Sequence, residues 1–110
     1  MNGELLPWKI LSHNVGVGVL TEGWNLDESS SDGESDEARV FTLPVNFDAP
    51  FENPPVVSLG LTGFDMDQGT SGRVSLKAVD ISAFGFTVQI TTWRDTRVFA
   101  VEFAWLAVGA

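Results

Sequence analysis

Apolar and polar residues alternate along most of this chain, and clusters of turn-forming residues separate the alternating stretches. A period of two places successive side chains on opposite faces of a strand, and no stretch keeps the period of an amphipathic helix. The pattern predicts six strands, at residues 15–20, 39–47, 56–61, 73–80, 85–93 and 98–108. Short strands separated by turns in this way are typical of an all-β, antiparallel β-sandwich.

One set of alternating positions supplies the expected core of the sandwich. Its members are apolar and recur at every second residue: Phe41, Leu43, Val45, Phe47, Val57, Leu59, Leu61, Val74, Leu76, Ala78, Phe86, Val88 and Ile90. The other set in the same strands consists mainly of serine, threonine, glycine, lysine and glutamine, which is typical of a solvated face. Each of these strands is therefore expected to bury one face only.

The last expected strand departs from this rule. Between residues 98 and 108 both sets of alternating positions are apolar, and Glu102 is the one polar residue. A strand with two apolar faces implies that its outer side is covered as well. The simplest cover is another copy of the chain in a symmetric oligomer. The alternative is an N-terminal segment that folds over that side with Leu5, Leu6, Trp8, Ile10 and Leu11.

The length of 110 residues suits one domain, with a segment at residues 1–14 before a sandwich at residues 15–110. The chain has 15 acidic and 6 basic residues, and its net charge of −9 repels nucleic acid and anionic membranes. No stretch approaches the roughly 18 apolar residues of a membrane helix, so no membrane insertion is expected. The N-terminus does not fit a secretory signal. We expect a soluble protein whose compartment stays open, with action outside the cell or at the cell surface included.

Catalytic and metal chemistry find little support in the composition. The chain has no cysteine and no tyrosine, and its single histidine, His13, precedes the first expected strand. Disulfides, thiolate nucleophiles and histidine-based metal clusters are thereby excluded within one chain, and a serine nucleophile has no evident base. We expect no enzyme activity and no cofactor.

Acidic residues offer two places for calcium or for paired catalytic carboxylates, namely the run from Asp27 to Glu37 and the pair Asp65 and Asp67. Neither place has the spacing of an EF-hand loop, and nothing orders two carboxylates across a cleft. A solvated loop is the favoured interpretation of the first. A turn between Gly63 and Gly69 is the favoured interpretation of the second.

A tryptophan occupies the outer set of positions at the end of the fifth expected strand. Trp93 stands where this strand otherwise carries threonine and glutamine, and the polar residues 94–97 follow directly. A pyranose has an apolar face that can lie on such a ring, and arginine presents several donors to its hydroxyl groups. Arg94 and, at the start of the preceding strand, Arg73 supply those donors. The alternative is that Trp93 seals the end of the sandwich while Arg94 and Arg97 pair with nearby acids.

Three stretches closely resemble the H-type lectin domain, which is the domain of snail agglutinins and of the C-terminal part of discoidins. They are FDAPFENPPVV at residues 47–57, the run GFTVQITTWRDTRV that starts at Gly85, and the closing WLAVG at residues 105–109. The similarity extends from Val15 to the C-terminus. It implies an antiparallel sandwich of six strands that assembles as a trimer, sometimes with trimers stacked into hexamers. It also implies sites for galactose or N-acetylgalactosamine between neighbouring protomers.

The resemblance further implies roles for four residues. Arg73 matches the family's sugar-contacting arginine, Trp93 matches its aromatic residue, and Asp36 falls near an aspartate that contacts the sugar, here as an acceptor from a neighbouring chain. Arg94 stands where snail agglutinins have a histidine, and a permanently charged donor there can favour acidic glycans. Because the chain has no cysteine, any hexamer would rest on packing alone.

The sequence therefore predicts a lectin without catalytic activity that engages glycosylated surfaces through several weak sites at once, as in cell adhesion. Its expected partners are glycans of the galactose or N-acetylgalactosamine type, acidic ones included, and further copies of the chain in a trimer or hexamer. The alternative function is a structural or adaptor sandwich of a larger assembly that does not bind sugar.

Overall fold

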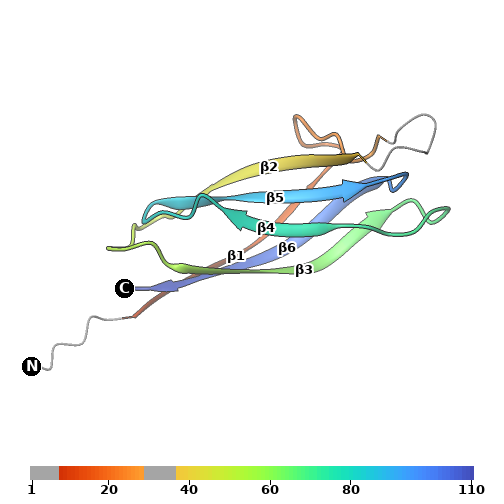
Figure 1. Cartoon of the computed structure of the whole chain (residues 1–110). Coiled ribbons are helices and arrows are strands. Elements are labelled where there is room, and N and C mark those ends of the chain that lie inside the picture. The colour runs from red at the N-terminus through yellow and green to blue at the C-terminus, as the bar shows by residue number, and fades with distance from the viewer. Residues whose placement is uncertain (1–7, 29–36) are drawn as a thin grey trace, which may run out of the picture.

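Six antiparallel strands form two three-stranded sheets in the computed structural model, which describes residues 8–28 and 37–110 (Figure 1). The strands are β1 (Lys9–Gly18), β2 (Ala38–Asn46), β3 (Val56–Met66), β4 (Ser75–Val79), β5 (Gly85–Trp93) and β6 (Val98–Gly109). Sheet A has the order β1-β6-β3, and sheet B has the order β2-β5-β4. The prediction of an all-β sandwich with six antiparallel strands is confirmed.

Three strands have bounds that differ from the predicted ones by more than one residue. β1 begins at Lys9 rather than at Val15, β3 continues to Met66, and β4 is shorter than its alternation indicated. The early part of β1 lacks a clear period of two because polar residues, Lys9 and His13, stand on the side that faces inward in the rest of the strand. The Lys9 ammonium group is bonded to two backbone carbonyl oxygens of residues 49 and 50, both at 2.7 Å.

The core lies between the two sheets and is built mainly by their central strands, β5 and β6. Most of the predicted core residues are buried in it or packed against it, and Val88, Ile90 and Phe103 are completely buried. Aromatic rings with centroids 5.1–5.8 Å apart fill part of this space: Phe47, Phe51, Phe86 and Trp105. Such tilted and edge-on ring pairs add to the stabilisation from apolar burial.

Leu61 is the exception among the predicted core residues. Its side chain is 40% exposed, although Leu61 pairs with the buried Phe103 and so keeps the inward side of β3. The register of β3 against β6 shifts directly after this residue, between Leu61 and Gly63, where a bulge interrupts the regular ladder. The prediction of a buried Leu61 is therefore wrong.

The outer face of sheet A is apolar and exposed in a single chain. Leu106 lies on β6 at 41% exposure, and Ile10 and Val56 on the flanking strands are 64% and 75% exposed. Residues 9–11 pair beside β6 instead of folding over its outer side, and Leu5 and Leu6 lie outside the described residues. Cover by another copy of the chain stays a prediction.

Gly85 marks a close approach between β5 and β2. A side-chain carbon added at this position would lie 2.2 Å from the carbonyl oxygen of Val45, within the β2–β5 ladder. We expect Gly85→Ala to lower the free energy of unfolding by about 1–3 kcal/mol, because the backbone must shift to admit the methyl group. Gly60→Ala is the control, since nothing lies within 4 Å of the carbon added there. Urea denaturation compares the two variants, and equal losses would contradict this explanation.

Candidate functional site

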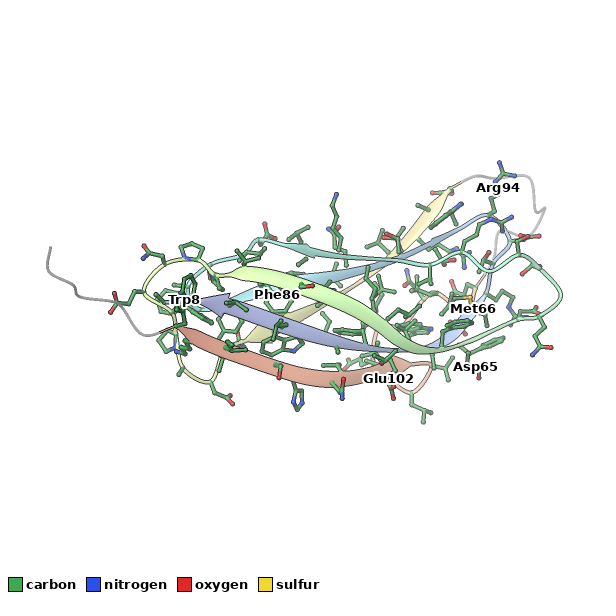
Figure 2. All side chains as sticks on the ribbon, turned by 90° about the horizontal axis from the view of Figure 1, so that it is seen from below. Trp8, Asp65, Met66, Phe86, Arg94 and Glu102 are labelled. Carbon is green, nitrogen blue, oxygen red and sulfur yellow. The ribbon has the colours of Figure 1, made fainter. Side chains whose placement is uncertain are left out.

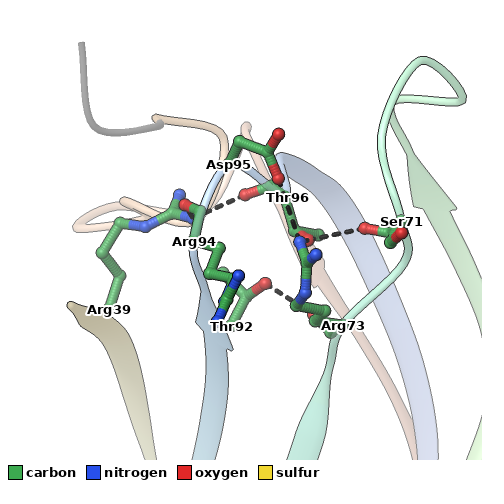
Figure 3. A network of polar contacts seen from close by, with 7 residues as sticks. All are labelled: Arg39, Ser71, Arg73, Thr92, Arg94, Asp95 and Thr96. Carbon is green, nitrogen blue, oxygen red and sulfur yellow. Dashed lines mark hydrogen bonds and ion pairs between the residues drawn. The ribbon is translucent and has the colours of Figure 1, made fainter. Parts of the chain in front are cut away.

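Segments that are distant in the sequence meet at the end of the sandwich where β5 turns into β6 (Figure 3). One segment is the start of β2, another leads into β4, and the third is the turn at residues 94–97 together with the end of β5. The group, which we call the turn cluster, consists of Arg39, Ser71, Arg73, Thr92, Arg94, Asp95 and Thr96.

Arg73 is fixed by two side chains of the turn. Its Nη1 group donates to Asp95 Oδ1 at 3.0 Å and to Thr96 Oγ1 at 2.8 Å. The buried Thr96 hydroxyl in turn donates to the carbonyl oxygen of Ser71 at 2.6 Å. The side chain of Arg73 is 22% exposed and that of Asp95 is 47% exposed, so the ion pair borders on solvent. Because charged hydrogen bonds fix direction as well as distance, the guanidinium group is held in one orientation.

Arg39 holds the turn from the opposite side. Its guanidinium group donates to the carbonyl oxygens of Leu26 at 3.3 Å, of Arg94 at 3.0 Å, and of Thr96. Partial burial lowers the pKa of Arg39, and attraction by Glu28 and Asp27 raises it again in part. Arginine stays charged throughout the physiological range, so one cation binds the backbone of two loops together.

Thr92 completes the attachment of the segment before β4. Its hydroxyl group is fully buried and donates to the carbonyl oxygen of Arg73. The backbone and the guanidinium group of Arg73 are therefore both tied to the β5–β6 region. A site built in this way presents its donors with little reorganisation when a ligand binds.

Trp93 and Arg94 form the outer part of this end. Trp93 is the last residue of β5, it pairs with Ala38 of β2, and its ring is partly exposed. Arg94 follows with φ at 60°, in the left-handed region that residues other than glycine rarely adopt. This conformation costs of the order of 1 kcal/mol, and the carbonyl oxygen of Arg94 accepts a hydrogen bond from Arg39.

Four of the chain's six basic residues gather at this end, Arg39, Arg73, Arg94 and Arg97, although the whole chain has a net charge of −9. Arg97 donates from Nε to the carbonyl oxygen of residue 27 at 2.8 Å, and its guanidinium lies 5.2 Å from the centre of the Phe99 ring. Acidic residues stand among them, because Asp95 pairs with Arg73, Asp67 lies 3.9 Å from Arg97 Nη1, and Asp27 and Glu28 attract Arg39. The end of the sandwich therefore carries charges of both signs, and its arginines offer N–H donors to a hydroxyl-rich ligand.

The structure brings three of the four predicted site residues to one end of the molecule. Arg73, Trp93 and Arg94 belong to or adjoin the turn cluster. Asp36 lies outside the described residues. Contact of these side chains with a sugar stays a prediction.

Arg39, Thr92 and Thr96 were missed by the sequence-based reasoning. A signal was present for Arg39, because it continues the inward set of β2 positions occupied by Phe41 and Leu43, where an arginine must find buried partners. Thr92 carries the same signal, because it continues the inward set of β5 positions occupied by Val88 and Ile90. No comparable signal marks Thr96, whose polar partners come from segments 23 and 25 residues away in the sequence.

Asp67, one of the acidic residues that might hold a metal, is engaged otherwise. Asp67 accepts the backbone N–H of Gly69 at 2.9 Å, and its other oxygen lies 3.9 Å from Arg97 Nη1. This bonding is typical of a turn. Among residues 8–28 and 37–110, no group of three or more histidine, aspartate or glutamate side chains is arranged to hold a metal ion.

Comparison with protein families identifies one match. The family profile described as the H-type lectin domain matches residues 42–108. The protein named "ATP synthase subunits region ORF 7" of Fuscovulum blasticum is 40% identical over 72 residues, which are 66% of this chain and 63% of that protein. This chain therefore covers less than two thirds of that relative.

Two solved structures of discoidin II from Dictyostelium discoideum share the fold. The recombinant form superposes with a TM-score of 0.74 over 92% of this chain and 36% of discoidin II. The wild-type form superposes with a TM-score of 0.75 over 94% and 37% of the two chains, and the sequence identity is 22% in both cases.

The described part of the chain contains no helix that is long and apolar enough to cross a membrane.

Proposed function

Because the chain belongs to the H-type lectin family, we propose that it binds carbohydrate at the turn cluster, without catalysing a reaction. The observations that support this proposal are the partly exposed Trp93 at the end of β5 and the oriented guanidinium group of Arg73 beside the turn that follows β5. An aromatic plate beside fixed donors is the combination that a pyranose ring requires.

Each of these residues has a distinct role in the proposed complex. The ring of Trp93 takes the apolar C–H face of the sugar. Both described side-chain bonds of Arg73 use Nη1, so Nη2 and Nε direct further N–H groups toward the hydroxyl oxygens. Asp36 of a neighbouring copy accepts from a sugar hydroxyl. Galactose-type and N-acetylgalactosamine-type glycans are the proposed ligand class.

We also propose that several copies assemble. The exposed apolar outer face of sheet A suits contact with sister subunits in a trimer or a hexamer, with sugar sites between protomers. Individual sites would bind in the millimolar to micromolar range, and simultaneous engagement of several sites would raise the avidity by about 10²–10⁴-fold. Such a protein would hold glycosylated surfaces together.

Arg94 is the residue expected to modify sugar preference. An exposed arginine adds a permanent positive charge beside Trp93, so acidic glycans should bind more tightly than their neutral counterparts. We expect Arg94→His to reduce this preference by about 5- to 30-fold, the equivalent of one lost charged hydrogen bond at an exposed site. Titration of matched sialylated and unsialylated galactosides measures the ratio. An unchanged ratio would remove Arg94 from the site.

A glycan array probed with the intact protein tests the proposed function as a whole. Binding to glycans that end in galactose or N-acetylgalactosamine is the expected result. If no glycan binds to the folded oligomer, the chain is a structural or adaptor sandwich instead.

A further inference from the structure

The side of the sandwich between β1 and β2 is open. On the other side, β3 of sheet A and β4 of sheet B approach each other, whereas β1 and β2 make no comparable contact along their described lengths. A groove of about 300 Å³ opens between them. Trp105 of β6 lies at its floor. Its walls include apolar side chains at inward positions of both edge strands: Leu11, Val15, Leu43 and Val45.

Alternate residues of β1 direct their backbone groups away from the sandwich. Val19 donates its N–H to Phe99 on the β6 side, at 2.9 Å. Gly18 instead turns both its N–H and its carbonyl oxygen toward Thr21. In an antiparallel ladder this orientation recurs at every second residue. The outward orientation therefore applies to the even-numbered residues of β1. Three of them have no described backbone partner on this side: Ser12, Asn14 and Gly16.

The other three edge strands carry features that oppose pairing with a further strand. β2 has Pro44 near its centre, β3 changes register against β6 twice, and β4 is only 5 residues long with Lys77 in the middle. β1 has 10 residues in continuous register with β6 and contains no proline. Its one lysine, Lys9, is bonded to carbonyl oxygens of the 49–50 segment rather than guarding the edge.

We propose that β1 pairs with β1 of a second copy, antiparallel and around a two-fold axis at residue 13. In this register the even-numbered residues form the new hydrogen-bonded pairs, and both copies keep the same face toward the core. Leu11 lies opposite Val15 of the second copy and closes the groove, while Ser12 lies opposite Asn14 on the outer face. β1 contains no carboxylate, so the pairing opposes no acidic side chains although each chain is strongly acidic. Lys9 lies opposite Val17 of the second copy, and His13 meets its own copy on the axis.

The two-fold pairing joins two copies of sheet A into one six-stranded sheet. It uses the edge of sheet A and leaves the outer face free for the trimer contacts proposed above. The number of copies in solution is therefore even: two if only the edges meet, six if trimers also form. The edge is separate from the turn cluster, so this inference does not depend on the proposed sugar binding.

Two double variants test the pairing and its register by sedimentation equilibrium of the full chain. S12K/N14K places lysine opposite lysine between the copies, and like charges in directly opposed positions destabilise a strand pair. S12K/N14E has the same sites substituted but places lysine opposite glutamate. The expected mass of S12K/N14K is half that of the native protein, and S12K/N14E keeps the native mass. Ser12→Pro, which removes one edge N–H, should also halve the mass, and Ser12→Ala should not.

A native protein that sediments as a monomer or as a trimer would overturn the proposal, and so would equal masses for the two double variants. If the native chain is a monomer, the β1 edge remains available for pairing with a strand of a different protein. Titration with monovalent galactose accompanies each sample. Because the sugar sites are proposed at the trimer contacts and not at the β1 edge, the double variants should keep the galactose affinity of the native protein. Absence of binding by the native protein would instead mark failure of the sugar-binding function, so the two failures are distinguished.

Discussion

Replacing Trp93 by alanine should abolish glycan binding and leave the sandwich folded. The indole is partly exposed at the last position of β5 and stands outside the buried core cluster, so its removal opens no cavity between the sheets. An aromatic residue at the centre of a binding site contributes about 2 kcal/mol or more, which is a loss of affinity of roughly 30-fold or greater. Because the single sites are already weak, we expect Trp93→Ala to show no binding on a glycan array.

Trp8→Ala is the matched control for this variant. Trp8 is also an indole, 76% exposed, and it lies at the end of the molecule opposite to Arg94 (Figure 2). Its removal should leave glycan binding unchanged. Full binding by Trp93→Ala, or equal losses from both variants, would show that the sugar does not rest on Trp93.

Replacing Arg39 by methionine should weaken both the fold and the site. Methionine keeps much of the apolar stem but cannot donate to the carbonyl oxygens of Leu26, Arg94 and Thr96. Loss of these bonds should lower the free energy of unfolding by about 2–4 kcal/mol, because buried carbonyl oxygens lose a charged donor. The turn that positions Trp93 and Arg94 is then no longer held, and glycan affinity should fall with it.

Arg39→Lys tests whether a positive charge at position 39 is sufficient or whether the planar geometry of the guanidinium group is needed. An ammonium group carries the same charge but cannot span three carbonyl oxygens in the way a planar guanidinium does, so it should restore only part of the stability. Urea denaturation and glycan titration are measured on both variants. Native affinity in Arg39→Met would mean that Arg39 has only a structural role.

The fold was predictable because most strands bury one face, and the alternation then records burial directly. In β5 the inward residues Phe86, Val88 and Ile90 are all buried. The pattern failed where the sandwich is open or irregular. The first half of β1 faces the groove and therefore admits His13 at an inward position, and Leu61 precedes a bulge that its sequence does not announce.

The residue types of the candidate site were predictable from the sequence. The hydrogen-bond partners that hold these residues in place were not. Trp93, Arg94 and Arg73 stand out because they interrupt polar or apolar patterns in ways that the resemblance explains. Arg39 acts on Arg94 across 55 positions of the sequence, and Arg73 pairs with Asp95 across 22. Partners of this kind depend on how the strands are registered in the sheets, and a local pattern of residues contains no record of that register.

The central claim is that a sugar contacts the end of the sandwich at Trp93. Titration of ¹⁵N-labelled protein with N-acetylgalactosamine and with galactose tests it directly, because indole N–H signals report each tryptophan separately once Trp93→Phe has identified the signal of Trp93. We expect the Trp93 indole and the backbone signals of residues 94–97 to shift in a saturable manner. Shifts confined to other regions, such as the groove between β1 and β2, or no shift with either sugar, would contradict the claim.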